Sequence, residues 1–266
     1  SDLEASFFIW GQNKGYKRPD LETDKSKVVE FVLERMSEAA LEDALRKAWF
    51  DDTDAALVTD SPAGVLSATA DVDDYNTIDA FWKQLYAIVA VTAARRYTIT
   101  ENANASYATQ LALAADRAIL MARAMVQNCD KRLKGDKNKI FIWTDTLVDN
   151  YQTYLESQGI DKSFERIEDF DSGLTFTGMY FRGIPIYRFD LWDRTIVEDF
   201  DSGTAYYQPH RAILTTKANL AIGVDSKSMI NTFESWLERK DKKVNLRGSY
   251  KLDVKIVKDY MVQVAY

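Results

Sequence analysis

The spacing of apolar residues divides the chain into a helical first part and a strand-rich second part. Over residues 25–49 apolar side chains recur at steps of three and four, as at Val29, Leu33 and Met36, which predicts one long helix. From Leu174 onward the spacing changes to two, with turn residues between the runs, which predicts a sheet. The predicted fold class is therefore α+β, with helices early and strands late.

The same criteria predict the remaining elements. Residues 4–10 and 140–143 are expected to form apolar strands, and residues 51–76 a long surface loop. Further helices are expected over residues 77–94, 105–133, 145–158 and 227–240. The strands of the second part are expected at 174–181, 184–190, 211–216 and 219–224, followed by two closing strands paired around Gly248 or Asp259.

Composition excludes several classes of protein. The chain has 34 basic and 41 acidic residues and a formal charge of -7, which argues against a protein whose main work is to neutralise phosphates. Cys129 is the only cysteine, so one chain can build neither a disulfide framework nor a cysteine-rich zinc site. No apolar run approaches the ~20 residues of a membrane-spanning helix, and the first residues lack a signal-peptide layout. We therefore expect a soluble protein made inside the cell.

One short acidic motif occurs twice, as EDFDSG at residues 168–173 and again at residues 198–203. Its carboxylates could bind calcium, since hard cations prefer several oxygen ligands on a loop. The spacing is not that of an EF-hand, because Ser and Gly follow the second Asp at once. An Asp-Ser-Gly turn is the favoured interpretation of both copies. The carboxylates concerned are Asp169, Asp171, Asp199 and Asp201.

Other residues that could carry chemistry have structural explanations. The junction IFIWTDTLV is comparable with the haloacid-dehalogenase pattern, but Trp143 stands in the nucleophile's place, so Asp145 is predicted to cap the following helix. His210 is the only histidine, and no Gly-x-Ser-x-Gly elbow accompanies it, which favours a structural or surface role. Cys129 is predicted to be a core residue. Asn104 to Ser106 match a glycosylation sequon, for which a helix start is the ordinary explanation.

Phosphate loops are also missing, because the sequence contains neither GxxxxGK[ST] nor GxGxxG. No catalytic, cofactor-binding or metal-binding residue is therefore assigned.

Taken in order, the elements resemble those of the major capsid proteins of tailed bacteriophages, whose shell fold is shared with encapsulins. EASFFIW and the helix at 25–49 resemble the entry strand and spine helix of the peripheral domain, and residues 51–76 the loop after the spine. Residues 119–156 resemble the helix, strand and helix that begin the axial domain. The turn at Gly183, Ile184 and Pro185 resembles the family's Gly, apolar, Pro turn. This likeness covers nearly the whole chain and rests on order, which makes it a fold-level analogy.

The resemblance implies an HK97-like capsid fold with a long spine helix, a peripheral β-sheet and a mixed axial domain. Residues 1–76 would contribute the spine and loop of the peripheral domain, 77–235 the axial domain, and 236–266 the returning peripheral strands. The family places an N-terminal arm and a long extended hairpin before the spine. Only 24 residues precede Lys25, so these parts are expected to be absent.

The function implied is that of a structural subunit, not an enzyme, without cofactors. It would assemble with copies of itself in hexamers and pentamers, and with other virion proteins, into an icosahedral head shell in the host cytoplasm. The shell would enclose DNA without sequence-specific binding and without a membrane. Three alternatives stay open: an encapsulin-type compartment shell, an acidic metal-dependent hydrolase that uses the Asp-rich turns, and a ligand-binding α+β module with exposed tryptophans.

Overall fold

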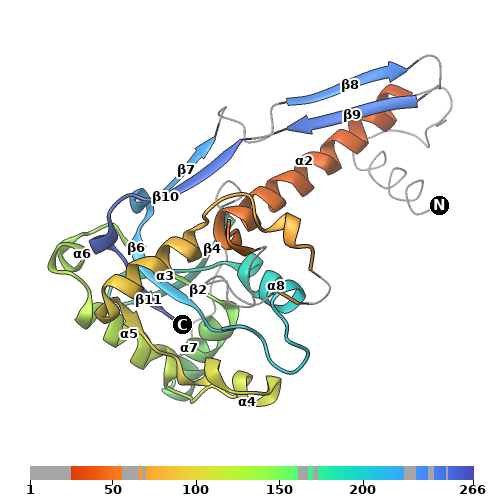
Figure 1. Cartoon of the computed structure of the whole chain (residues 1–266). Helices are drawn as coiled ribbons and strands as arrows, with labels where there is room; N and C mark the ends of the chain where they lie inside the picture. Colours follow the sequence, from red (N-terminus) through yellow and green to blue (C-terminus); the bar gives the residue numbers. More distant parts are fainter. Residues whose placement is uncertain are drawn as a thin grey trace. The chain divides into compact units, whose positions relative to one another are not determined.

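The chain forms two compact units (Figure 1). The smaller unit contains Ser1–Ala44 and Val224–Lys251, and the larger contains Leu45–Gly223 and Leu252–Tyr266. The computed structural model describes residues 25–55, 66–67, 70–160, 167–169, 173–224, 232–238, 243–249 and 251–266. The strand expected at residues 4–10 lies outside these ranges.

The smaller unit combines a helix with a β-hairpin. Helix α2 runs from Lys25 to Phe50, which confirms the predicted long helix; its residues up to Ala44 belong to this unit. Strands β8 (Thr232–Glu238) and β9 (Lys243–Ser249) form an antiparallel pair. The helix predicted over 227–240 is wrong at these seven strand residues, because each of them has a partner on β9. Cross-strand pairing has overridden the local helical pattern.

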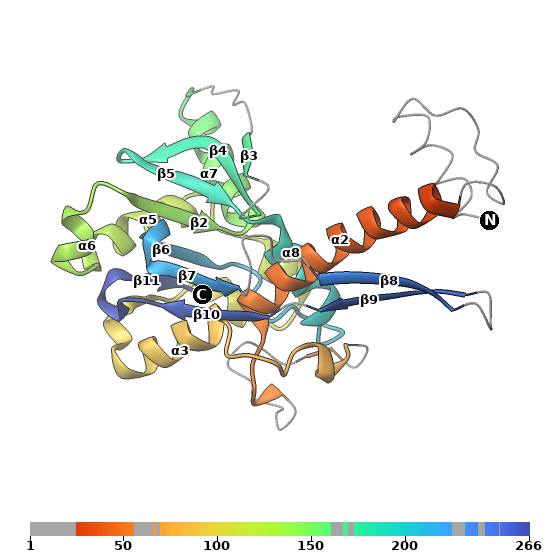
Figure 2. The same ribbon diagram turned by 90° about the horizontal axis from the view of Figure 1, so that it is seen from above.

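The larger unit is organised around a seven-stranded mixed sheet with the order β1-β11-β6-β2-β5-β4-β3 (Figures 1 and 2). The pairs β1/β11 and β2/β5 are parallel, and the other four pairs are antiparallel. The strands of this sheet are β1 (Arg96–Tyr97), β2 (Lys139–Trp143), β3 (Ile167–Asp169), β4 (Leu174–Phe181), β5 (Ile184–Arg188), β6 (Ala212–Thr216) and β11 (Gln263–Ala265). The predicted α+β class and the strands at 140–143, 174–181 and 184–190 are confirmed, although the last ends at Arg188.

A second, two-stranded sheet contains β7 (Leu220–Val224) and β10 (Leu252–Ile256). The prediction that the closing residues form two strands paired with each other is wrong. β9 pairs with β8, β10 with β7, and β11 with β1 and β6. A run of alternating residues shows that a segment is extended, but its partners are decided by contacts far away in sequence.

Alternation along the strands of the large sheet creates two cores. On β2, Ile140 and Ile142 belong to one buried cluster, while Phe141 and Trp143 belong to the other. The first cluster contains residues of α3, α8 and the end of α2, and the second contains residues of α5 and α7. Since successive side chains of a strand point to opposite faces, these two groups of helices cover opposite faces of the sheet.

Six α-helices of the described chain follow α2. They are α3 (Phe81–Val91), α4 (Tyr107–Leu111), α5 (Arg117–Asn128), α6 (Lys131–Gly135), α7 (Asp145–Ser157) and α8 (Asp190–Asp199). Short 3-10 turns occur at Val72–Asp74, Ala93–Arg95, Thr100–Ala103, Lys217–Asn219 and Asp259–Met261. The helix predicted at 145–158 is confirmed, and Gly159, with φ +72, ends it. Helix α8 was not predicted.

The single helix predicted over 105–133 is wrong, because the segment forms three helices. Asn150 of α7 explains the first break: its Oδ1 accepts the Ala118 N–H (3.0 Å) and its Nδ2 donates to the Ala114 carbonyl (2.9 Å). The second break lies at Asp130, whose carboxylate accepts the Arg132 N–H (2.8 Å) and caps α6. Leu111, at the start of the supposed buried stripe, is 51% exposed.

Helix α3 begins at Phe81 and not at Thr77 as predicted. Asp51 holds the preceding residues in a turn, because its carboxylate accepts the Thr77 hydroxyl and its carbonyl accepts the Ala80 N–H (3.0 Å). Thr77 and Ala80 therefore bond to Asp51, the residue after α2, and the first helical turn starts after them.

Candidate functional site

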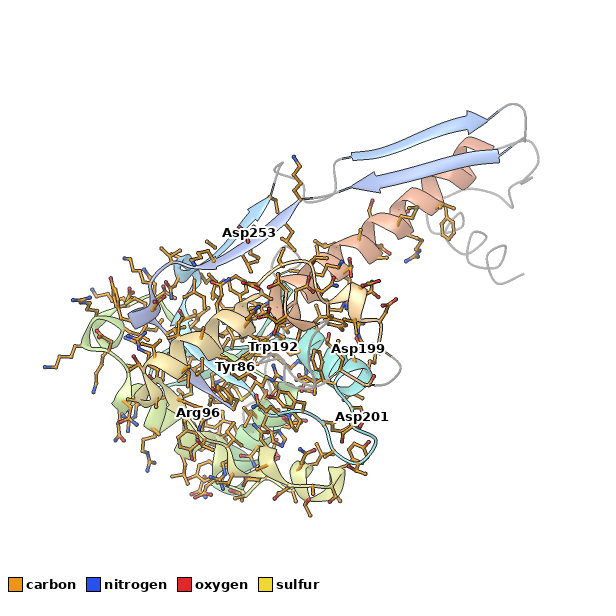
Figure 3. The ribbon with its side chains drawn as sticks, viewed as in Figure 1. Tyr86, Arg96, Trp192, Asp199, Asp201 and Asp253 are labelled. Atoms are coloured by element: carbon orange, nitrogen blue, oxygen red, sulfur yellow. The ribbon has the colours of Figure 1, made fainter. Side chains whose placement is uncertain are left out.

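The repeated acidic motif forms a turn at its second copy (Figure 3). Asp201 accepts the Gly203 N–H (2.8 Å) and the Tyr107 hydroxyl, and Gly203 has φ +85, as a left-handed turn residue does. Asp199 accepts the Tyr75 hydroxyl. The predicted Asp-Ser-Gly turn is thus present here. The side chains of Asp169 and Asp171 lie outside the described residues.

The described part of the chain contains no group of three or more His, Cys, Asp or Glu side chains placed to hold a metal ion. Asp199 and Asp201 are instead occupied by two tyrosine hydroxyls from distant segments, Tyr75 and Tyr107. In this arrangement the acidic turn fastens the end of α8 to the loop before α3 and to α4.

The junction between β2 and α7 differs from the prediction by one residue. Thr144 is the N-cap, and Asp145 is the first residue of α7. The carboxylate that caps the helix comes from α8, where Asp193 Oδ2 accepts the Asp145 N–H (2.9 Å). Asp145 pairs instead with Arg188 (2.9 Å), which also contacts Asp190. Trp143, in the nucleophile position of the compared pattern, is fully buried.

Asp193 has an unusual ionisation. Its pKa is raised to about 7, mainly by burial and also by the nearby carboxylates of Asp145 and Asp190, while the hydrogen bond from the Asp145 N–H lowers it. A carboxyl that is partly protonated near neutral pH could act as an acid or a base. Sequence reasoning did not identify Asp193, although an acidic residue in the first turn of an unrecognised helix was the available signal.

His210 lies in the interior and bonds through both ring nitrogens. Nε2 donates to the Gln110 carbonyl (2.8 Å), so Nδ1 accepts from the Thr146 hydroxyl (2.7 Å). Its main-chain N–H and carbonyl both bond to Asn102 (3.0 and 2.8 Å). Burial lowers the pKa of the imidazole, which keeps it neutral. His210 therefore joins three segments, and of the two roles predicted for it, structural or surface, its burial fits the structural one.

Next to His210, Arg211 is fully buried in an aromatic environment. Its guanidinium lies 4.8 Å from the Trp82 ring centroid and 5.3 Å from that of Phe50. Nε donates to the Gln208 carbonyl (2.9 Å) and a terminal nitrogen to the Tyr207 carbonyl (3.2 Å). These contacts replace the hydration that the cation loses on burial.

Two further sequence predictions are confirmed. Cys129 is buried, its thiol contacts the Val126 carbonyl (3.3 Å), and burial raises the pKa of the thiol. Ser106 of the sequon is the N-cap of α4, with its hydroxyl accepting the Thr109 N–H. The four tryptophans whose side chains are described are all buried and offer no exposed ring to a ligand: Trp49, Trp82, Trp143 and Trp192.

The candidate surface for contacts is a groove between α3 and β10, with a volume of about 380 Å³. Ala87, Ile88 and Val91 line its helical side, and Val91 is 88% exposed. Gln84 fixes the groove's floor, because its Nε2 donates to the Val254 carbonyl (2.8 Å) and its Oε1 accepts the Ile256 N–H (3.0 Å). An apolar surface of this kind is typical of an interaction site. We name it the α3–β10 groove.

Comparison with known proteins adds no relative: neither a protein-family model nor a curated protein matches this chain. Among the described residues, no helix has both the length and the apolar character needed to cross a membrane.

Proposed function

We propose that this protein is a structural, self-assembling shell subunit of the kind represented by the major capsid proteins of tailed bacteriophages. The observation that carries the proposal is the composition of the smaller unit. It joins the first part of the 26-residue helix α2 to an antiparallel hairpin that comes from almost 200 residues later in the sequence. A long helix combined with a returning β-hairpin is what the resemblance predicts for a peripheral domain.

The larger unit supports the same proposal as a counterpart of the axial domain. It contains a mixed sheet with helices on both faces, and its chain leaves for the smaller unit at Gly223 and returns at Leu252. Leu252–Tyr266, which the resemblance assigned to the returning peripheral strands, belong to this larger unit. The unusual ionisable groups Asp193, His210 and Arg211 are each engaged in holding segments together. The structural engagement of these groups favours a structural protein that acts by contacts between subunits.

Copies of the chain would form hexamers and pentamers within a closed icosahedral shell, since closed symmetry requires a subunit to offer complementary surfaces to its neighbours. We assign one of these contacts to the α3–β10 groove, where the exposed Val91 would be covered by a second copy. The rim of the groove carries charges of both signs, with Arg95 and Lys255 positive and Asp259 negative. Such a pattern favours one relative alignment of the two copies over others. The shell would enclose DNA as part of a virion.

Assembly of the purified chain tests the proposal. We expect closed particles, or hexamers and pentamers, that increase with protein concentration and are visible by electron microscopy and light scattering. A chain that remains monomeric at every concentration and salt condition would contradict it.

Two controls separate the alternatives. A large increase in the thermal unfolding temperature with calcium or magnesium would favour the metal-dependent hydrolase. Particles produced in cells that contain protein cargo and no DNA would favour the encapsulin-type compartment.

A further inference from the structure

A hollow of about 400 Å³ lies between the loop that joins α6 to β2 and the turn that joins β4 to β5. Figure 2 shows α6 and this turn at the same end of the larger unit, where β2 begins. The volume falls in the range of roughly 300–1,000 Å³ that is usual for small-molecule sites. We name this feature the basic hollow, because its lining contains four cations and one carboxylate: Lys134, Lys137, Lys139, Arg182 and Asp136.

Three of the four cations are available to a ligand. Lys134, Lys137 and Arg182 are exposed and form no ion pair with any carboxylate that the structure describes. Lys139 is held in place, because its Nζ donates to the carbonyls of Lys134 (2.8 Å) and Asp136. A positive field therefore remains in the hollow of a chain whose formal charge is -7.

The single carboxylate offsets only one of the four positive charges. Asp136 Oδ1 accepts the Asn138 N–H (2.8 Å) and stabilises the turn between α6 and β2. Four of the chain's 34 basic residues thus line this hollow, against one acid.

The turn on the other side of the hollow presents Arg182 at a position that arginine rarely takes. Arg182 and Gly183 have φ +51 and +77, the pattern of a two-residue type I′ turn, for which Asn, Asp and Gly are the favoured residues. Its guanidinium lies over the Phe181 ring, 5.4 Å from the centroid, which restricts its orientation. This turn therefore holds a guanidinium at the rim of the hollow.

We propose that the basic hollow binds phosphate groups of a polyanion. A phosphate offers several acceptor oxygens and more than one negative charge, so it can bond to the guanidinium fork of Arg182 and to the ammonium groups of Lys134 and Lys137 at once. Two sources share this chemistry, a small polyphosphate compound and the backbone of a nucleic acid. The inference goes beyond the proposed shell function and does not depend on it.

Calorimetric titration of the full chain tests this site with two probes, inorganic tripolyphosphate and a single-stranded oligonucleotide. We expect the double variant Lys137→Gln/Arg182→Gln to weaken binding of the better probe at least tenfold. The matched control is Arg123→Gln/Arg194→Gln, which removes two exposed cations outside both the hollow and the α3–β10 groove and is expected to bind as the parent chain does. Equal thermal unfolding temperatures of the three proteins establish that the variants are folded.

The outcomes assign or reject the site. Tighter binding of tripolyphosphate assigns a small polyphosphate ligand. Tighter binding of the oligonucleotide, with an affinity that falls steeply as salt increases, assigns a nucleic-acid backbone. The proposal is overturned if neither probe binds, if both double variants weaken binding equally, or if an oligo-aspartate peptide binds more tightly than either phosphate probe.

Discussion

Asp193 of α8 accepts the main-chain N–H of Asp145, the first residue of α7, at 2.9 Å. The two residues are 48 positions apart, yet one caps the helix that the other begins. The contact connects the two helices that follow the parallel strands β2 and β5, and it places a buried carboxyl where its protonation affects the whole junction.

The first prediction concerns this carboxyl. Because the pKa of Asp193 rises from 3.8 to about 7 on folding, the folded state holds its proton more tightly than the unfolded state. Its contribution to stability is therefore full below about pH 4 and is lost as the pH rises to about 7. Asp193→Asn keeps an acceptor oxygen for the Asp145 N–H and removes the charge. We expect the variant to lose less stability than the parent between pH 4 and 8, by urea unfolding.

The effect of Asp193 must be separated from that of other charges. Other charged groups also act electrostatically at this junction, namely Arg188, Arg211, Asp145 and Asp190. The Asp193→Asn variant is therefore compared with Glu156→Gln, which removes an exposed acid of α7. A stability difference between Asp193→Asn and the parent that is constant with pH would contradict the prediction.

The second prediction concerns His210, whose pKa is lowered by burial. Here the unfolded state binds the proton more tightly, so the neutral histidine contributes stability above its unfolded pKa of about 6.5, and this stability is lost as the pH falls below that value. The loss can reach about 1.4 kcal/mol per pH unit for one proton. We expect His210→Gln to be less stable than the parent at pH 8 but to show a flatter decrease between pH 6.5 and 5. An unchanged slope would contradict a buried neutral imidazole.

The third prediction addresses the α3–β10 groove. Val91→Asp places a charge on a side chain that is already 88% exposed, so the free subunit should remain folded while a contact with a second copy should be lost. We expect the concentration needed for assembly to rise at least tenfold, measured by light scattering. Val197→Asp on α8, where Val197 is 48% exposed, is the matched control and should assemble normally. Equal effects of the two variants would exclude the groove as the specific contact.

These contacts also mark what the sequence could predict. Helix α2, strand β2 and helix α7 were predicted because their periodicity is local and continues for several turns or residues. The division of residues 105–133 into three helices could not be predicted, since Asn150 supplies the cap from another helix. Residues 232–238 were predicted to be helical because a short apolar run fits the spacing of a helix as well as that of a strand. Only the pairing with β9 decides between the two.

The candidate sites show the same limit. The structural role of His210 followed from the absence of a partner motif, but its bond to the Gln110 carbonyl crosses 100 positions and leaves no local signal. Helix α8, and with it Asp193, was missed because it follows a strand directly, although Trp192 and Ile196 have helical spacing. The basic hollow arises only when two turns more than 40 residues apart come together.

The fourth prediction tests the cap that divides the third helix. Asn150→Ala removes both bonds to the start of α5, and we expect a loss of about 1–2 kcal/mol in the free energy of unfolding. Asn128→Ala, at the exposed end of α5, is the control and should change stability by less than about 0.5 kcal/mol. Equal losses in the two variants would mean that Asn150 does not fix the break.

The fifth prediction uses the two glycines of the repeated acidic motif. Both have positive φ, but an added Cβ would meet nothing within 4 Å at Gly203, whereas at Gly173 it would lie 2.8 Å from the Phe189 ring and 3.1 Å from Leu45. We expect Gly203→Ala to cost about 1 kcal/mol from the backbone alone and Gly173→Ala about 1–3 kcal/mol more. Thermal unfolding of the two variants measures the difference, and a similar cost at both sites would contradict the close packing at Gly173.

The pairing of β7 with β10 makes the segment between them separable. The chain leaves the larger unit after Gly223 and returns to it at Leu252, and a Cβ on Gly223 would lie 3.6 Å from the Asp253 carbonyl, so the points of departure and return are adjacent. A short engineered turn could therefore replace the segment between β7 and β10, which contains the hairpin, and leave the strand pairing of the larger unit unchanged. The same position is a natural point for grafting a foreign peptide, or for the gain and exchange of such hairpins during the divergence of related chains.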